Sequence, residues 1–151
     1  MDTLSGYVSL RKIKSDDLNR VVTIANTLFR EYYTLDFFVS MWEISPDTFL
    51  VAEHQGEVIG FILAVHDDIS SARILMLSIV QVYQGKGIGS SLLRMLLCRI
   101  RDRVKKISLE VRTDNTQAIS FYLHHGFQVK NRLKYFYSDG SDGYLMEKIL
   151  S

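Results

Sequence analysis

Three glycines, at positions 85, 87 and 89, stand between an apolar run and an amphipathic segment. The apolar run, residues 73–80, is typical of a buried β-strand. From Ile88 apolar residues recur every three or four positions, which predicts a helix of about four turns that ends in basic residues, through Lys106. A strand that turns through glycines into a helix directs backbone N–H groups and the positive helix end toward one point. The sequence therefore predicts an anion-binding loop between a strand and a helix.

Two well-known phosphate loops do not fit this segment. The dinucleotide pattern needs a third glycine where the chain has Ser90 or Leu92, counted from Gly85 or Gly87 respectively. The triphosphate loop needs serine or threonine after its Gly-Lys pair, and Gly87 stands there instead. A glycine turn without a ligand remains the alternative.

Hydrophobic periodicity along the rest of the chain predicts a mixed α/β fold. Short apolar or alternating runs predict strands at residues 7–13, 49–53, 58–65, 73–80, 107–111, 127–137 and 144–150. Apolar residues at helical spacing predict helices at residues 18–29, 31–42, 88–104 and 116–125. Ser15 or Asp16 is expected to cap the first helix and residues 113–115 the last, which ends at Gly126. This order predicts an antiparallel first half and one central strand–helix–strand crossover.

Length and composition favour one domain, residues 1–151. Nearly half of the residues, 47%, are hydrophobic, and the formal net charge of +1 gives no global field for nucleic acid or an anionic membrane. The N-terminal residues lack a signal-peptide pattern and no apolar stretch approaches about 20 residues, so we expect a soluble cytoplasmic protein. The single cysteine, Cys98, lies in an apolar run and is expected to be a buried structural thiol. The histidines lack ligand spacing, so no metal site is expected.

Two blocks of the sequence resemble the GNAT superfamily of N-acetyltransferases. The pyrophosphate motif of that family, Q/R-x-x-G-x-G/A, is matched by Gln84, Gly87 and Gly89. Residues 109–122, followed by Gly126-Phe127, resemble the L-E-V-R-x-x-N-x-x-A-I-x-x-Y…G-F block of RimI-like and archaeal protein N-terminal acetyltransferases. The chain departs from the family at Gln81, where proline is common. The resemblance implies a GNAT fold with about seven mostly antiparallel strands, about four helices and a strand–helix–strand acetyl-CoA core.

The same resemblance implies where the cosubstrate, acetyl-CoA, would bind. The pantetheine arm would lie along Leu77, Ser78 and Ile79. The pyrophosphate would be held by Gln84, Gly85, Lys86, Gly87, Ile88, Gly89 and Ser90. Asn115 would reach the coenzyme near its reacting end, although the same residue can be a plain helix cap.

Acetyl transfer from a thioester to an amine needs a base, a polarised carbonyl and a proton for the departing thiolate. Glu110 is the candidate base, and the alternative is an ion pair with Arg112 or another neighbouring strand residue. Tyr122 is the candidate acid, and the alternative is a core aromatic. Backbone N–H groups at the end of the fourth strand would polarise the carbonyl. No activated cysteine or serine is visible, which favours direct transfer in a ternary complex.

The acceptor is expected to be a protein or peptide N-terminus, with ribosomal and nascent chains as candidates. The resemblance places Tyr32 and Tyr33, and Tyr135 and Phe136, beside the peptide entrance, where the family commonly has a Tyr-Tyr pair in the late hairpin. Alternatively, these aromatics fill a satellite core. Transfer to a polyamine-like small molecule or to lysine, and a catalytically idle CoA-binding module, remain the competing functions.

Overall fold

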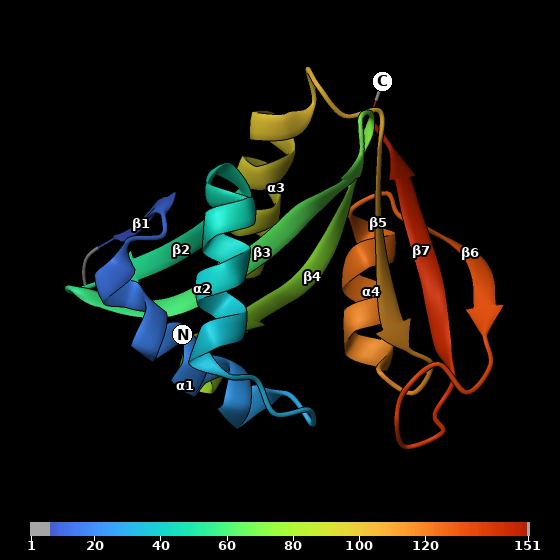
Figure 1. Ribbon diagram of the computed structural model, residues 1–151, viewed down its shortest axis with the longest axis horizontal. Coiled ribbons are helices and arrows are strands. Elements are labelled where there is room, and N and C mark those ends of the chain that lie inside the picture. Colours follow the sequence, from blue (N-terminus) through green and yellow to red (C-terminus); the bar gives the residue numbers. More distant parts are fainter. Residues whose placement is uncertain (1–6, 151) are drawn as a thin grey trace. The chain divides into compact units, whose positions relative to one another are not determined.

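The computed structural model describes residues 7–150. Its strands are Val8–Lys12 (β1), Phe49–His54 (β2), Glu57–Asp68 (β3), Ser71–Ile79 (β4), Lys106–Arg112 (β5), Gln128–Leu133 (β6) and Gly143–Ile149 (β7). Its α-helices are Leu18–Leu28 (α1), Leu35–Ile44 (α2), Ile88–Ile100 (α3) and Thr116–His124 (α4), and 3₁₀ turns are formed by Ser15–Asp17 (η1), Pro46–Thr48 (η2) and Gln81–Tyr83 (η3). The predicted order of elements is confirmed (Figure 1).

The seven strands form one sheet with hydrogen-bonded neighbours in the order β1-β2-β3-β4-β5-β7-β6. The pairs β1–β2, β2–β3, β5–β7 and β6–β7 are antiparallel, and β4–β5 is parallel. The predicted mixed sheet with one central crossover is therefore confirmed. The chain divides into two compact units, residues 7–65 with 76–100 and residues 66–75 with 101–150. Ser71–Leu75 of β4 belong to the second unit and Met76–Ile79 to the first.

In the first unit, helices cover both faces of the β2–β3 hairpin. Phe38 of α2 is fully buried, with its ring centroid 6.2 Å from that of Phe49 on β2 and 6.0 Å from that of Phe61 on β3. Figure 1 shows α2 in front of these strands and α3 behind them. The core face of α3 is formed by Ile88, Leu92, Leu93, Leu96 and Ile100. Burial of this apolar stripe holds the helix, and with it the glycine loop, against the sheet.

Three predicted helix boundaries in the first unit are wrong. Ser15 and Asp16 do not cap α1, because they lie in η1, where Asp17 Oδ2 accepts the Lys14 N–H at 2.7 Å. The second helix begins at Leu35 and not at residue 31, because the Thr34 hydroxyl caps it by accepting the Phe37 N–H at 3.1 Å. Helix α3 ends at Ile100, so most of the basic stretch lies beyond the helix.

In the second unit, β5 pairs with β7 along its whole length, and β7 also pairs with β6. Ile107, opposite Lys148 in the register, is buried, and the Lys148 Nζ donates to the His125 carbonyl oxygen at 2.5 Å, just after α4. Helix α4 therefore covers the sheet face to which Ile107, Leu109 and Val111 point. Strand β6 ends at Leu133 and not at residue 137, because the backbone of Tyr135 is left-handed, with φ 54°.

The predicted helix cap and helix end in this unit are confirmed. Asn115 Oδ1 accepts the Ala118 N–H at 3.1 Å, and Gly126 after α4 has φ 89°. None of the helices within residues 7–150 combines the length and apolarity needed to cross a membrane.

Candidate active site

The glycine loop begins where β4 ends. The turn η3 follows the strand, and the Gln84 side chain folds back so that its Nε2 donates to the Ile79 carbonyl oxygen at 2.9 Å. Backbone bonds from Tyr83 to Val80 (2.8 Å) and from Gln84 to Gln81 (3.1 Å) close the turn. The first motif residue thus fixes the path of the chain at the strand end, a role that the sequence did not indicate.

Two glycines of the loop have a backbone that other residues adopt only with strain. Gly85 has φ 77° and Gly87 has φ 86°, and a Cβ added at either position would meet no protein atom within 4 Å. The backbone conformation, rather than crowding by the protein, therefore requires glycine at these positions. The open side leaves room for a ligand to approach the backbone closely.

Helix α3 adds the backbone N–H donors of its first turn to the loop. Its first intrahelical bond runs from the Ser91 N–H to the Gly87 carbonyl oxygen at 3.0 Å. The N–H groups of Ile88 and Gly89 precede this bond, in the first turn of the helix, where the i−4 acceptor is missing. Together with the positive end of the helix dipole, these donors fit a pyrophosphate.

The last residues of β4 carry one unsatisfied polar group. The Ser78 hydroxyl is the buried side-chain oxygen within residues 7–150 that has no hydrogen-bond partner in the structure. Buried polar groups are nearly always paired, so such a group is expected to have a function or a ligand. Ser78 lies in the segment predicted to hold the pantetheine arm.

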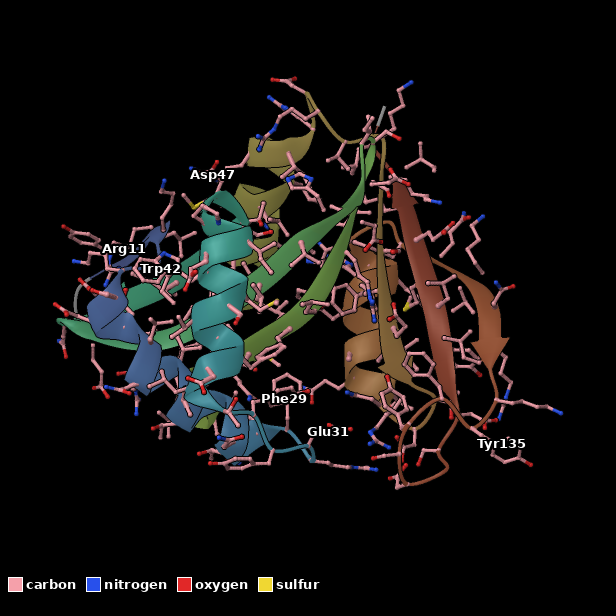
Figure 2. All side chains as sticks on the ribbon, viewed as in Figure 1. Arg11, Phe29, Glu31, Trp42, Asp47 and Tyr135 are labelled. Carbon is pink, nitrogen blue, oxygen red and sulfur yellow. The ribbon has the colours of Figure 1, made fainter. Side chains whose placement is uncertain are left out.

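The aromatic pair of the first unit has two different environments. Tyr32 is 79% exposed, whereas Tyr33 lies 6.0 Å from Phe29 and 5.5 Å from Phe37 between ring centroids. The Asn26 side chain holds the Tyr33 backbone through bonds of 2.7 and 2.8 Å. Tyr33 therefore belongs to an aromatic cluster, as the satellite-core alternative supposed, and Tyr32 remains available to a ligand. Figure 2 shows Phe29 and Glu31 just beyond the end of α1.

In the second unit, Glu110 forms an ion pair with Arg73 of β4. The parallel register pairs Arg73 with Ser108, so the two side chains project from the same face of the strands. The Glu110 side chain is 12% exposed. Its two oxygens offer about four acceptor sites, so the ion pair leaves acceptor capacity for a substrate proton.

Arg73 is the residue that sequence reasoning missed. Its contact with Glu110 could have been predicted only from the strand register, because the two residues are 37 positions apart in the sequence. Arg112, considered as the partner of Glu110, instead binds Asp139 through Nη1 at 3.0 and 3.2 Å.

Tyr122 lies on the other side of β5. Its ring packs 5.1 Å from Phe121 and 5.3 Å from Phe127 between centroids, and burial raises the pKa of its hydroxyl above the usual value near 10. Helix α4 covers the face of Ile107, whereas Glu110 projects from the opposite face. Glu110 and the helix that carries Tyr122 therefore lie on opposite faces of β5.

The late hairpin presents the second aromatic pair. Tyr135 is 78% and Phe136 44% exposed, and Figure 2 shows Tyr135 projecting from the loop that follows β6. Both side chains can therefore contact a ligand.

Cys98 is exposed, so the prediction of a buried thiol is wrong. The residue stands two positions after Leu96, about 200° around the helix, which turns it away from the core face of α3. Among residues 7–150 there is no group of three or more His, Cys, Asp or Glu side chains arranged to hold a metal ion.

Residues 18–127 match the model of the acetyltransferase (GNAT) family. This chain belongs to the GNAT family. It is 28% identical over 150 residues to an N-alpha-acetyltransferase of Sulfolobus acidocaldarius, with 91% of this chain and 89% of the relative covered. The structure of Ard1 from Thermoplasma volcanium superposes with a TM-score of 0.92 at 34% identity, covering 95% of this GNAT chain and 98% of Ard1.

A further GNAT structure is informative because of its ligand. Arabidopsis thaliana Naa50, in complex with the bisubstrate analogue CoA-Ac-MVNAL, superposes with a TM-score of 0.84 at 25% identity. The match covers 93% of this chain and 97% of Naa50.

Proposed function

We propose that the protein transfers the acetyl group of acetyl-CoA to the α-amino group of protein N-termini. The glycine loop carries the proposal, because it combines two left-handed glycines, an open side and the N-terminal end of α3 in a GNAT chain. The names of the relatives support the choice of amine, since Sulfolobus acidocaldarius and Sulfurisphaera tokodaii proteins that align over 91% of this chain are N-alpha-acetyltransferases.

The first unit would hold the cosubstrate, which supplies the acetyl group as an activated thioester. The backbone N–H groups of residues 85–90 would bind its pyrophosphate, and Leu77–Ile79 would contact its pantetheine arm. A polar group of that arm would satisfy the buried Ser78 hydroxyl. In the second unit, Asn115 caps α4 with Oδ1, so its Nδ2 still has donors for a ligand.

Glu110 would act on the amine, and Tyr122 would stabilise the departing thiolate. As the amine forms its bond to the carbonyl carbon and the carbon–sulfur bond breaks, Glu110 takes the proton lost by nitrogen, directly or through water. Burial raises the pKa of Tyr122, so its hydroxyl keeps its proton at working pH and donates a hydrogen bond to the departing sulfur.

The free energy of deprotonation favours an α-amine as acceptor. An α-ammonium with a pKa near 8 loses its proton near neutrality for under roughly 1 kcal/mol, whereas a lysine near 10.4 needs about 4 kcal/mol. A site with one carboxylate base suits the first acceptor. The pairing of Glu110 with Arg73 also gives a locally neutral surface, which would not attract a polyamine.

An acetyl-transfer assay tests the proposal. The acceptors are a panel of peptides with free N-termini, an N-terminally blocked peptide with an internal lysine, and spermidine. We expect transfer to free N-termini only. Transfer to spermidine alone would contradict the proposal, and binding of CoA without any transfer would indicate an idle binding module.

A matched pair of variants tests the base. Glu110→Gln should lower kcat about 100-fold for loss of a general base. Glu147→Gln is the control, because Glu147 is also ion-paired on this sheet face, with Lys106 at 3.5 Å. Equal effects of the two substitutions would remove Glu110 from the reaction.

We further propose that the acceptors are cytoplasmic proteins, ribosomal or nascent chains among them. The exposed, unpaired thiol of Cys98 suits a reducing compartment.

A further inference from the structure

The loop of residues 134–142, between β6 and β7, is fixed at its start by Asp142. Asp142 Oδ1 accepts the Tyr135 N–H at 3.0 Å, and its Oδ2 accepts from Arg132 Nε at 2.9 Å. The first bond holds Tyr135 in its left-handed conformation, φ 54°, which a large side chain rarely adopts. Such an outlier persists only where the surroundings impose it, and it is often found at functional positions.

A second anchor ties the same loop to β5. The Arg112 guanidinium donates to both carboxylate oxygens of Asp139, and its central carbon lies 4.2 Å from the centroid of the Tyr137 ring. Asp139 also accepts the Ser141 N–H at 3.0 Å, and these contacts lower its pKa to about 2. Arg112 therefore binds the loop through its ion pair with Asp139 and its stacking contact with the Tyr137 ring.

Gly143 makes this packing possible. A Cβ at this position would lie 3.1 Å from the Tyr137 ring and 3.3 Å from the Val111 carbonyl oxygen. The absence of a side chain lets Tyr137 rest on the strand beside Arg112. Its neighbours Tyr135 and Phe136 remain exposed.

We propose that Arg112 is a positioning residue for the acceptor, which acts through the loop and does not touch the reacting atoms. This inference rests on the proposed function. Arg112 follows Glu110 by two positions and so lies on the same face of β5. Strand β5 therefore carries both the proposed base, Glu110, and Arg112, which contacts the loop that bears the exposed aromatic side chains. A preformed loop loses little conformational freedom when a peptide binds, so loosening it weakens acceptor binding and spares cosubstrate binding.

Steady-state kinetics of three variants test the proposal. Arg112→Met removes the charge and the stack, Arg112→Lys keeps the charge but loses the planar fork, and Asp139→Asn weakens the pair from the other side. We expect Arg112→Met to raise KM for an N-terminal peptide about tenfold, Arg112→Lys to restore part of the loss, and KM for acetyl-CoA to stay within about twofold. The control is Lys130→Met on β6, an exposed cation of the same hairpin, which should leave both constants unchanged.

Limited trypsin digestion reports the loop itself. Lys134 is exposed at the start of the loop, and cleavage after it tracks local opening. Cleavage should be about tenfold faster in Arg112→Met than in the wild type. If the variant does not fold, Asp139→Asn and Arg112→Lys test the same contact.

Two outcomes would overturn the inference. Faster cleavage with an unchanged peptide KM would show an anchor that does not serve the acceptor, and equal rises of both KM values would show a general structural effect. A wild-type protein that acetylates no peptide would refute the proposed function, and the positioning role with it.

Discussion

Replacing Gly87 by alanine separates the two properties of the glycine loop, its backbone conformation and its open side. Gly87 has φ 86°, and a Cβ there would meet no protein atom within 4 Å. The free energy of unfolding should therefore fall only by the left-handed backbone penalty of about 1–2 kcal/mol. In a chain of this size, a loss of 1 kcal/mol lowers Tm by about 2–4 °C, so Tm should fall by about 2–8 °C.

Gly56→Ala is a matched control for this strain. Gly56 has φ 78° in the tight turn between β2 and β3, and a Cβ there would likewise meet no atom within 4 Å. The control should lose a similar free energy of unfolding. Its turn carries none of the residues expected to contact the coenzyme.

Calorimetric titration with CoA then distinguishes the two variants. A methyl group at position 87 would occupy the open side and displace at least one N–H donor from the pyrophosphate. A hydrogen bond to a charged group contributes about 1.5–3 kcal/mol, which corresponds to a rise in Kd of about 10- to 100-fold. Gly56→Ala should bind CoA like the wild type. Equal losses of Tm with an unchanged Kd in Gly87→Ala would refute the phosphate-binding role of the loop.

Substitutions at three further residues probe other contacts. Arg73→Met should lower kcat about tenfold because the Glu110 carboxylate loses its partner, and Arg73→Lys should restore part of the lost kcat. Unchanged kinetics in Arg73→Met would show that the ion pair does not contribute to catalysis. Tyr122→Phe should lower kcat about 10- to 100-fold with Tm nearly unchanged. Because burial raises the pKa of Tyr122, the rate of the wild type should not fall through ionisation of this group below pH 10. Asp17 is desolvated, but bonds from Arg11 and the Lys14 N–H outweigh this effect and lower its pKa, so Asp17→Asn should cost about 1–3 kcal/mol at pH 7. In urea unfolding, that difference should shrink as the pH falls below about 4, the unfolded pKa; a constant difference would contradict the assigned ion pair.

Periodicity sufficed for the order of the elements, because each amphipathic run must bury one face whatever its neighbours are. The boundaries depended on single contacts that no pattern encodes. Thr34 starts α2 through one hydroxyl, and the left-handed Tyr135 ends β6 because Asp142, seven positions away, accepts its N–H. Burial of Cys98 was predicted wrongly because its neighbours along the chain are apolar. Its position around the helix axis turns the side chain away from the core.

Those parts of the candidate site that depend on local sequence were predictable. The contacts that depend on strand register could not be predicted from the sequence. Gly87 and Asn115 are local, since the glycine spacing predicts a turn and the residues before α4 predict a cap. The contact between Arg73 and Glu110 exists only because β4 and β5 run parallel with Arg73 opposite Ser108. A shift of that register by one residue would turn Arg73 to the other face and leave Glu110 without this partner.

The charges on the Glu110 face of the second unit occur as opposite pairs. Glu110 pairs with Arg73, Arg112 with Asp139, and Lys106 with Glu147. Neutral pairs provide little long-range attraction for a cationic acceptor, because the field of each charge is offset by its neighbour. Selection of the acceptor must then depend on contacts made at close range. The exposed Tyr135 and Phe136, in the loop that Arg112 contacts through Asp139, are the side chains of this unit best placed to make those contacts.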